Sequence, residues 1–540
     1  MAMMEQKFLR RVDFESYEDF KANFGMKVPD QFSFALDVVD EWAKTEPEKL
    51  ALLYTDDEGT AERFSFARMS ALSKLCAGYL VSKGIKPGDR VLALLRRRWE
   101  YWVLAVATSR IGCTLIPASI QLTEKDILYR VNASQAKLVV ALKDPFVMEQ
   151  VKHLEQKCES LTEVVIAGSE DAPFNRGMMA AQPFEDEVRL ENGAEMIIYF
   201  TSGTTGMPKM VVHNRTYPIG HIVTAKYMQG VQNNGLHLTQ ADSGWAKFGW
   251  GNIYGQWICG SAILGYDPVR FHATAFLNTL KTHRPTSLCV PPTIYRFLLR
   301  EGMEQAHVAS IKWFSTAGEP LSPEVNKELE RICGLPIREG FGQSEGTPIT
   351  CAFPWLGVRP GSMGKPSPLY DVRLIDKEGH RVERGDNGEV VMFVDPNETP
   401  LGLMCGYDID GVLTRNYTNI YHTGDIAYED EDGYYWYVGR QDDIIKCSGY
   451  RIGPFEIESI INTHPAVKES AVIGRPDEVR GQVVCAVIAL RDGFTASDEL
   501  SAQIKQYVKS STAPYKYPRV IEYLPELPKT TSGKIIRNVL

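Results

Sequence analysis

Between about residues 35 and 345, short apolar runs alternate with longer amphipathic stretches, and this alternation constrains the fold more than any other feature. Residues 91–95, 114–117 and 137–142 have the composition of buried strands. Residues 65–81 and 124–133 have the spacing of amphipathic helices. Because alternating strands and helices usually form parallel sheets with helices on both faces, the pattern predicts an α/β fold with mostly parallel sheets.

The pattern changes in the last third of the chain. From 361 to 438, short β-rich runs are separated by Gly, Asp and Asn, which is typical of a small antiparallel barrel. After residue 442 the pattern predicts a compact α+β unit, with helices at 455–462 and 498–508 and strands between them. Since 540 residues exceed the usual size of one hydrophobic core, at least two domains are expected.

Composition excludes several classes of protein. The net charge of −9 argues against a nucleic-acid partner. No apolar run reaches the ~18 residues of a membrane span, because the candidate at 101–120 is interrupted by Arg110. The first residues lack the apolar core of a secretory signal. Ten cysteines without a C-x-x-C pair indicate reduced thiols rather than disulfides or a zinc site. We therefore expect a cytoplasmic location.

One loop predicts contact with a polyphosphate. The apolar run 196–200 reads as a buried strand, and it is followed by a loop of glycines and hydroxyl residues that ends in Pro208 and Lys209. Glycines let successive backbone N–H groups face one concavity, and the lysine adds a positive charge. The spacing differs from the usual P-loop, in which a helix follows the lysine. A plain surface loop is the alternative for this string alone.

Four further strings follow in order along the chain. They are EGFGQSE at 339–345, YHTGD at 421–425, VGRQDDIIKCSGYRIGP at 438–454 and PKTTSGKI at 528–535. Each string alone is also typical of a turn or a solvated loop. Together with loop 201–209 they resemble the signature motifs of the adenylate-forming superfamily, the acyl-CoA synthetases, over essentially the whole chain. GYRIGP at 449–454 and APYKYPR at 513–519 are most similar to the medium-chain acyl-CoA synthetase branch.

The resemblance implies a two-domain fold. A large N-terminal domain, 1–439, would contain two mostly parallel α/β sheets and a small β-barrel at about 350–439. A hinge at 440–442, with Asp442 as its pivot, would connect it to a small mobile α+β domain at 443–540. Rotation about this hinge would exchange the lysine loop near Gly533 for the segment around Gly449 between two half-reactions.

The resemblance also implies the chemistry. A carboxylic acid attacks the α-phosphate of ATP, which gives acyl-AMP and pyrophosphate, and coenzyme A then takes the acyl group and releases AMP. Because the reactants are anionic, the site must neutralise charge before they meet. ATP, Mg²⁺ and coenzyme A are the implied cofactors. The implied catalytic residues are Thr201, Glu345 and Lys534, and Glu345 would also bind Mg²⁺.

Residues implied to bind ATP or AMP lie in these motifs. They are Thr201, Ser202, Gly203, Thr204, Thr205, Gly206, Met207, Pro208, Lys209, Gly318, Glu319, Pro320, Glu339, Gly340, Phe341, Gly342, Gln343, Ser344, Asp425, Arg440 and Lys534. The loop would hold the β- and γ-phosphates, and Ser344 would contact the α-phosphate. Asp425 would accept hydrogen bonds from the ribose hydroxyls, supported by Arg440. Adenine would lie against 318–320 and the backbone of 339–341.

Residues implied to bind coenzyme A lie mainly in the C-terminal part. They are Gln121, Ser448, Gly449, Tyr450, Arg451, Arg480, Lys509, Tyr517, Pro518 and Arg519. Gly449 would leave space for the pantetheine arm, because it has no side chain. For Arg480, Lys509 and Arg519, a solvated surface charge is an equally good interpretation.

The implied acyl pocket contains Trp245, Trp250, Gly342 and Ser344. Acetate-specific relatives carry a tryptophan near Gly342, so its absence predicts room for more than two carbons. Removing an indole frees on the order of 150–250 Å² of contact surface. Lys247 is unusual in an apolar tunnel, and a snorkelling or solvent-facing side chain is favoured over a clamp for a polar substrate group.

The function predicted from all of this is that of an ATP-dependent acid–CoA ligase for a medium-chain, branched or aromatic acid. Two alternatives remain: an adenylation enzyme that loads a carrier protein, and a non-catalytic protein that binds acyl groups or nucleotides. The expected partners are a small carboxylic acid, ATP and CoA, with no nucleic acid and no integral membrane segment. The sequence allows a homodimer but does not specify one.

Overall fold

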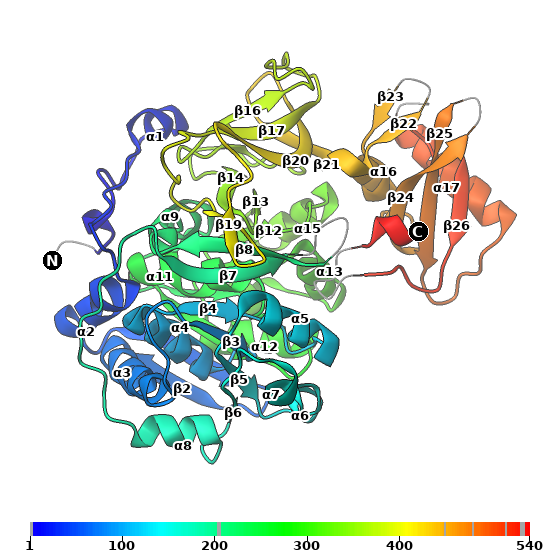
Figure 1. Ribbon diagram of the computed structural model, residues 1–540. Coiled ribbons are helices and arrows are strands. Elements are labelled where there is room, and N and C mark those ends of the chain that lie inside the picture. Colours follow the sequence, from blue (N-terminus) through cyan, green and yellow to red (C-terminus); the bar gives the residue numbers. More distant parts are fainter. Residues whose placement is uncertain (1–3, 202–206, 448–449, 478–479, 513–515, 530–534) are drawn as a thin grey trace. The chain divides into compact units, whose positions relative to one another are not determined.

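The computed structural model of the protein describes residues 4–201, 207–447, 450–477, 480–512, 516–529 and 535–540 (Figure 1). The chain forms two compact units. The first contains Met1–Pro360, Gly364–Asp371 and Val394–Asn419. The second contains Gly361–Met363, Val372–Phe393 and Ile420–Leu540. The boundary therefore lies within the β-rich region and not at the expected hinge, and the hinge at 440–442 stays a prediction.

In the described part of the first unit, one sheet has eight strands in the order β19-β18-β8-β7-β4-β3-β5-β6. Its strands are β3 (Arg90–Leu94), β4 (Thr114–Pro117), β5 (Leu138–Leu142), β6 (Glu163–Ala167), β7 (Glu195–Thr201), β8 (Lys209–Asn214), β18 (Gly406–Ile409) and β19 (Val412–Thr414). The strands from β7 to β6 in this order are parallel, as predicted, and β8, β18 and β19 add an antiparallel edge.

The described residues also form a nine-stranded sheet in the order β15-β14-β13-β12-β11-β9-β10-β1-β2. Its strands are β1 (Leu50–Asp56), β2 (Ala61–Ser65), β9 (Leu236–Thr239), β10 (Ala262–Asp267), β11 (Ser287–Cys289), β12 (Trp313–Ala317), β13 (Ile337–Gln343), β14 (Gly346–Cys351) and β15 (Lys365–Pro366). The strands from β13 to β1 in this order are parallel. Two mostly parallel sheets are thus confirmed.

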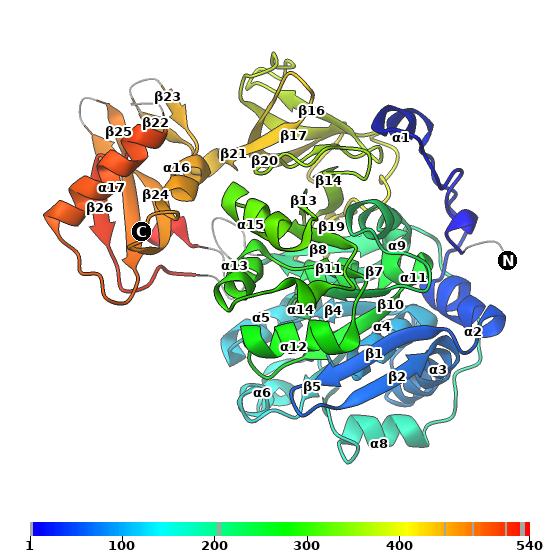
Figure 2. The same ribbon diagram turned by 180° about the vertical axis from the view of Figure 1, so that it is seen from behind.

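Helices cover both faces of each sheet (Figure 2). The described α-helices of this unit are α1 (Tyr17–Asn23), α2 (Glu41–Thr45), α3 (Phe66–Ser82), α4 (Trp99–Ile111), α5 (Glu124–Ser134), α6 (Pro145–Val151), α7 (Leu154–Lys157), α8 (Pro173–Ala180), α9 (Tyr217–Gly220), α10 (Ala246–Asn252), α11 (Tyr254–Ile258), α12 (Ala273–His283), α13 (Pro292–Arg300), α14 (Gln305–Val308) and α15 (Pro323–Cys333). Side chains alternate along β3, so that Val91 and Ala93 enter the core shared with α3, α4 and the nine-stranded sheet, whereas Leu92 and Leu94 pack toward α5 and α6.

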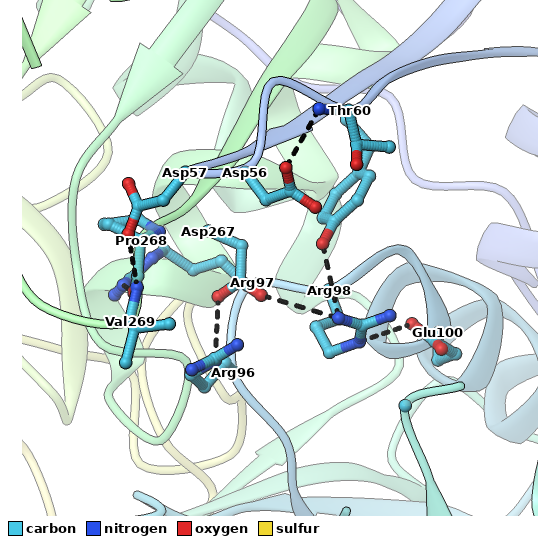
Figure 3. Close-up of polar contacts among 12 residues, drawn as sticks. Asp56, Asp57, Thr60, Arg96, Arg97, Arg98, Glu100, Asp267, Pro268 and Val269 are labelled. Atoms are coloured by element: carbon cyan, nitrogen blue, oxygen red, sulfur yellow. Dashed lines mark hydrogen bonds and ion pairs between the residues drawn. The ribbon is translucent and has the colours of Figure 1, made fainter. Parts of the chain in front are cut away.

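An arginine cluster joins the two sheets at the carboxyl ends of their strands (Figure 3). Arg96, just after β3, forms an ion pair of 3.2 Å with the buried Asp267 at the end of β10. Next to it, the Arg97 guanidinium donates hydrogen bonds to the carbonyls of Tyr266 (3.0 Å) and Ala241 (3.2 Å). Through the Ala241 carbonyl, the cluster holds the segment that leads to Trp245 in place. Ligands of parallel α/β sheets usually bind at this edge of the sheet.

In the second unit, four strands of the described residues form an antiparallel sheet in the order β16-β17-β20-β21. They are β16 (Asp371–Ile375), β17 (Gly388–Phe393), β20 (Ile420–Glu429) and β21 (Tyr435–Arg440). The region from about 350 to 439, where a small barrel is expected, supplies these four strands, and the barrel itself stays a prediction. The same region also supplies β15, which pairs with β14 of the nine-stranded sheet, and β18 and β19, which extend the eight-stranded sheet beyond β8.

The C-terminal part is the expected α+β unit. Its described strands are β22 (Ile445–Cys447), β23 (Tyr450–Ile452), β24 (Val467–Asp477), β25 (Gly481–Leu490) and β26 (Val520–Tyr523). Helices α16 (Pro454–Ile461) and α17 (Asp498–Ser511) bury Ile457, Ile461, Ile504 and Val508 against this sheet. Apolar residues at helical spacing on one face thus explain why these two segments are helices.

All ten cysteines are free thiols, and each is buried except the half-buried Cys333. Among the described helices, none is long and apolar enough to cross a membrane.

Candidate active site

The ends of the phosphate loop are held by strand pairing. Thr201 ends β7 and is paired with Lys209, the first residue of β8. Pro208 presents its carbonyl to the Tyr129 hydroxyl, which donates to it at 2.9 Å, and Met207 is exposed. A strand, β8, begins at this lysine, whereas a helix follows the lysine of the usual P-loop. Loop residues Ser202, Gly203, Thr204, Thr205 and Gly206 lie outside the described residues.

Glu345 lies next to this loop through a tyrosine that the sequence did not single out. The Tyr407 hydroxyl donates to Glu345 Oε1 at 2.9 Å. Lys209 Nζ lies over the Tyr407 ring, 5.1 Å from its centroid. The structure thus brings one predicted charged residue to the ring of Tyr407 and the other to its hydroxyl.

Ser344 is fixed through its main chain. His213, on β8, is buried, and its Nε2 lies 2.7 Å from the Ser344 carbonyl oxygen, so the neutral ring donates this hydrogen bond from Nε2. Burial lowers the pKa of His213 to about 4. The rings of Tyr217 and His221 continue this packing, and the His221 ring is stacked on Trp250 at 6.5 Å. Predicted phosphate and acyl residues therefore share one rigid aromatic support.

The predicted adenine segment 318–320 follows β12. Gly318 has φ +96°, a left-handed conformation that favours glycine, and open space lies where a side chain would be. Glu319 accepts a hydrogen bond of 2.8 Å from the Thr293 hydroxyl. Lys247 Nζ donates to the carbonyl of Ala317 at 2.8 Å, and burial lowers the pKa of this lysine. The expectation of a solvent-facing Lys247 is therefore wrong, because its ammonium binds the main chain beside the adenine segment.

The segment 339–341 forms part of β13. Glu339 is buried, and its Oε1 accepts a hydrogen bond of 3.4 Å from the Leu321 backbone N–H. Its Oε2 has no hydrogen-bond partner among the described residues. Burial raises the pKa of Glu339 to about 8, so this carboxyl is protonated at neutral pH. Gly340, Phe341 and Gln343 lie on the same strand.

Gly342 lies close to the neighbouring strand β14. A Cβ at Gly342 would lie 3.2 Å from the Thr347 carbonyl oxygen and 3.3 Å from Pro348 Cα, both on β14. A side chain there would require a small shift of this strand, and the space for an acyl tail beside Gly342 stays a prediction. Trp245 and Trp250 lie at the start and within α10, and both are partly buried.

A narrow space beside Trp245 is lined by residues of the β4–α5 connection, including Ser119 and Leu122, and by Phe200. Gln121, exposed, lies between Ser119 and Leu122 in that connection. The predicted coenzyme A contact Gln121 and the predicted acyl residue Trp245 are therefore neighbours in the first unit.

In the second unit, Asp425 and Arg440 form the predicted pair. They face each other on β20 and β21, and Arg440 Nη1 donates to Asp425 Oδ2 at 3.0 Å. The Tyr437 hydroxyl donates to Oδ1 at 3.2 Å, a contact that sequence reasoning missed. Asp425 is only 4% exposed. A hairpin of two adjacent strands therefore holds both carboxylate oxygens.

Among the predicted coenzyme A residues, three come together. Arg519 Cζ and Lys509 Nζ lie 5.2 and 5.6 Å from the centroid of the Tyr517 ring, and both cations are exposed. Pro518 between them is buried, and Arg480 follows β24, where its N–H donates to Asp477. Such a basic and aromatic cluster suits a phosphate-bearing ligand.

Several predicted residues cannot be placed. Ser448, Gly449 and Lys534 lie outside the described residues. Tyr450 and Arg451 begin β23, but only their backbone is described. Asp442 is exposed in the short 3₁₀ turn Gln441–Asp443 that follows β21.

The described residues contain no group of three or more potential metal ligands. Mg²⁺ usually binds one or two carboxylates together with substrate phosphates. The half-buried Glu345 carboxylate, beside the phosphate loop, fits such a shared site, whereas a cage made of protein ligands alone does not fit.

Comparison with known proteins identifies relatives over nearly the whole chain. Residues 39–398 match the AMP-binding enzymes, and 456–534 match the C-terminal domain of these enzymes. The chain is 38% identical to acyl-coenzyme A synthetase ACSM3, mitochondrial, of Mus musculus, over 98% of this chain and 93% of that protein. It is 25% identical to a benzoate CoA ligase from Burkholderia xenovorans LB400, with a TM-score of 0.81, over 94% of this chain and 99% of that one.

Proposed function

Because the chain belongs to the AMP-binding enzymes and is an acyl-CoA synthetase of the AMP-forming type, we propose how its residues share the two steps and which acids it uses. The observation that carries the proposal for the first step is the Asp425 carboxylate, which is buried and held on both oxygens. This geometry suits recognition of a diol, because a fixed carboxylate accepts hydrogen bonds from two adjacent hydroxyls.

In the proposed first step, loop 201–209 and Lys209 bind the β- and γ-phosphates, and Glu345 binds the Mg²⁺ that accompanies them. Mg²⁺ would neutralise phosphate charge when bound. The adenine ring lies against 318–320 and 339–341. Lys534 stabilises charge between the acid and the α-phosphate. The supporting observations are the pairing of Thr201 with Lys209 and the position of Glu345 one tyrosine away.

In the proposed second step, coenzyme A is the acceptor. Gln121 contributes from the first unit, and the cluster of Lys509, Tyr517 and Arg519 contributes from the second. The proposal includes a rotation of the C-terminal domain about residues 440–442. This rotation removes Lys534 from the reacting groups and brings the segment around Gly449 to them.

Replacement of Lys534 tests this division. Lys534→Ala should slow acyl-AMP formation by roughly 10²–10³-fold, the cost of one preorganised charge contact. Thioester formation from supplied acyl-AMP should persist, because the lysine serves only the first step. Pyrophosphate exchange and single-turnover transfer to CoA measure the two steps separately, and equal losses in both would refute the division.

The proposed substrate is a carboxylic acid with an apolar tail of medium length, branched or aromatic. The support is the pair Trp245 and Trp250 on α10, which offers flat apolar walls. Each buried methylene should raise kcat/KM about fourfold, since its burial is worth ~0.8 kcal/mol. The rise should begin at acetate and stop between about four and ten carbons, where the pocket is full.

CoA-dependent AMP release across acids of increasing length tests this proposal. Trp250→Ala should move the end of the rise to longer acids, whereas the control Trp436→Phe, in the second unit, should leave the profile unchanged. An optimum at acetate would refute the acid class. Transfer to a carrier protein in place of CoA would favour the carrier-loading alternative.

We also propose that the protein works in a reducing compartment, with the cytosol as the predicted one. Buried free thiols are consistent with such a compartment. The relative ACSM3 is named as mitochondrial. Cell fractionation decides between the two locations, and light scattering on the purified protein decides whether it is a homodimer.

A further inference from the structure

Strand register places Tyr407 beside the lysine of the phosphate loop. β18 runs antiparallel to β8, with Tyr407 opposite Val211 and Asp408 opposite Met210. Lys209 precedes Val211 by two residues, so its side chain leaves the same face of the sheet. Diagonal neighbours of this kind are within reach of long and aromatic side chains. The contact between Lys209 and Tyr407 therefore follows from the register.

Tyr407 contacts both charged residues that the first step is proposed to use. Its hydroxyl donates to Glu345 Oε1 at 2.9 Å, and its ring lies below Lys209 Nζ at 5.1 Å. Among the described residues, neither Lys209 nor Glu345 forms an ion pair within 4.0 Å with an oppositely charged side chain. The opposite charges thus flank the tyrosine instead of pairing with each other.

The backbone around Tyr407 is fixed on two sides. Met404 N–H donates to the Glu345 carbonyl at 2.7 Å, and Cys405 N–H donates to the Val212 carbonyl at 2.8 Å. A Cβ at Gly406 would lie 2.6 Å from the Thr414 carbonyl oxygen, so β18 and β19 approach closely only with glycine there. These contacts anchor the tyrosine both to the strand that follows the phosphate loop and to the residue it orients.

We propose that Tyr407 is a positioning residue for the adenylation step. Its hydroxyl fixes the orientation of the Glu345 carboxylate, and its ring keeps the Lys209 ammonium apart from that carboxylate. A carboxylate and an ammonium that do not neutralise each other remain available to Mg²⁺ and to phosphate. The inference rests on the proposed function, which assigns those ligands to Glu345 and Lys209.

Two substitutions separate the hydroxyl from the ring. Tyr407→Phe keeps the ring and removes the hydroxyl that donates to Glu345, so the affinity for ATP with Mg²⁺ should fall about tenfold, as expected for a lost bond to a charged group. The affinity for ATP with EDTA should change less than about twofold. Tyr407→Leu also removes the ring, and its affinity for ATP with EDTA should fall about threefold. Isothermal titration without acid substrate measures both affinities.

Two controls show whether the effect is merely structural. Tyr417→Phe removes another tyrosine hydroxyl from the same segment, one that donates to the Met404 carbonyl, and should leave the Mg²⁺ dependence unchanged. In a Glu345→Gln background, Tyr407→Phe should lower the affinity for ATP with Mg²⁺ by less than a further factor of about two. The reason is that the effects of two residues that act through one contact are not additive. Thermal unfolding of each variant confirms that it is folded.

The outcomes separate the inference from the proposed function. If the wild-type protein binds ATP more tightly with Mg²⁺ and Tyr407→Phe keeps this difference, the role of Tyr407 is refuted and the proposed function stands. Full additivity with Glu345→Gln refutes the role in the same way. If the wild-type protein binds ATP equally with and without Mg²⁺, the assignment of Mg²⁺ to Glu345 fails, and the inference fails with it.

Discussion

Asp425 and Glu345 are the two carboxylates assigned to ATP, and their surroundings differ. Asp425 is 4% exposed, and Arg440 and Tyr437 hold both of its oxygens. Glu345 is half-buried, and among the described residues only its Oε1 accepts a hydrogen bond. The carboxylate proposed to bind ribose is therefore held in place by protein contacts alone. The carboxylate proposed to bind Mg²⁺ keeps one oxygen without a hydrogen bond from the described residues, so the two should differ in what their loss removes.

Loss of Asp425 should have the largest effect, because it removes the ribose contact and leaves Arg440 without this ion pair. We expect Asp425→Asn to lower kcat/KM for ATP roughly 10²–10³-fold, since a site built around a hydroxyl contact discriminates strongly when that contact is lost. The matched control is Glu429→Gln at the other end of β20, whose partners are the exposed Arg381 and Arg384. Loss of activity in the control as well would show that β20 and not Asp425 is sensitive.

Glu345→Gln should have a smaller effect that depends on the metal. The side chain keeps its size and a hydrogen-bond acceptor for Tyr407, but it loses the charge that binds Mg²⁺. We expect about 10–100-fold lower kcat, with partial recovery at high Mg²⁺, because weaker ligation is offset by mass action. A magnesium titration of the initial rate measures this. An Mg²⁺ optimum identical to that of the wild-type protein would remove the distinction between the two carboxylates.

Lowering the pH should destabilise the folded protein through His213, which contacts the Ser344 carbonyl. Its folded-state pKa of about 4 lies below the ordinary value of ~6.5, so the unfolded chain binds a proton that the folded protein excludes as pH falls. Stability should therefore decrease between pH ~6.5 and ~4, by up to roughly 3 kcal/mol from this group. His213→Gln should flatten this part of the profile.

Urea unfolding at several pH values measures that change. The exposed His380 provides the control, and His380→Gln should follow the wild-type profile. If the free energy of unfolding of His213→Gln depends on pH as that of the wild-type protein does, the loss of stability in acid does not come from this histidine.

The smallest effects are expected for the exposed cations of the second unit. Lys509→Ala and Arg519→Ala should each raise the KM for CoA about three- to fivefold, and the effect should shrink with added salt, because exposed charges are screened. Lys468→Ala removes an exposed lysine of the same unit that lies 3.9 Å from Glu526 and serves as the control. Equal effects of all three on the KM for CoA would mean that general charge, and not the Tyr517 cluster, attracts the ligand.

The elements and residues that the sequence predicted correctly are those with a local signal. Strands such as Thr114–Pro117 and helices such as Glu124–Ser134 lie within a residue or so of their predictions, because their signals are local periodicities. The motifs identified Asp425 and Arg440, which face each other in one hairpin.

Contacts between residues far apart in the sequence could not be predicted. No local pattern shows that Tyr407 reaches Glu345, 62 residues away, or that β18 joins β8 and not a barrel. Lys247, on α10, was expected in solvent, because nothing in the local sequence shows that its ammonium reaches the Ala317 carbonyl at the end of β12. In each case the missing information was a contact distant in sequence.

The difference between the two carboxylates is tested most directly by ATP binding to Asp425→Asn and Glu345→Gln, measured by isothermal titration with Mg²⁺ and with EDTA. We predict that Asp425→Asn weakens binding by the same factor in both conditions. We predict that Glu345→Gln weakens binding with Mg²⁺ about tenfold or more and leaves binding with EDTA within about twofold. A common pattern for both variants, in either direction, would contradict the assignment of one carboxylate to ribose and the other to the metal.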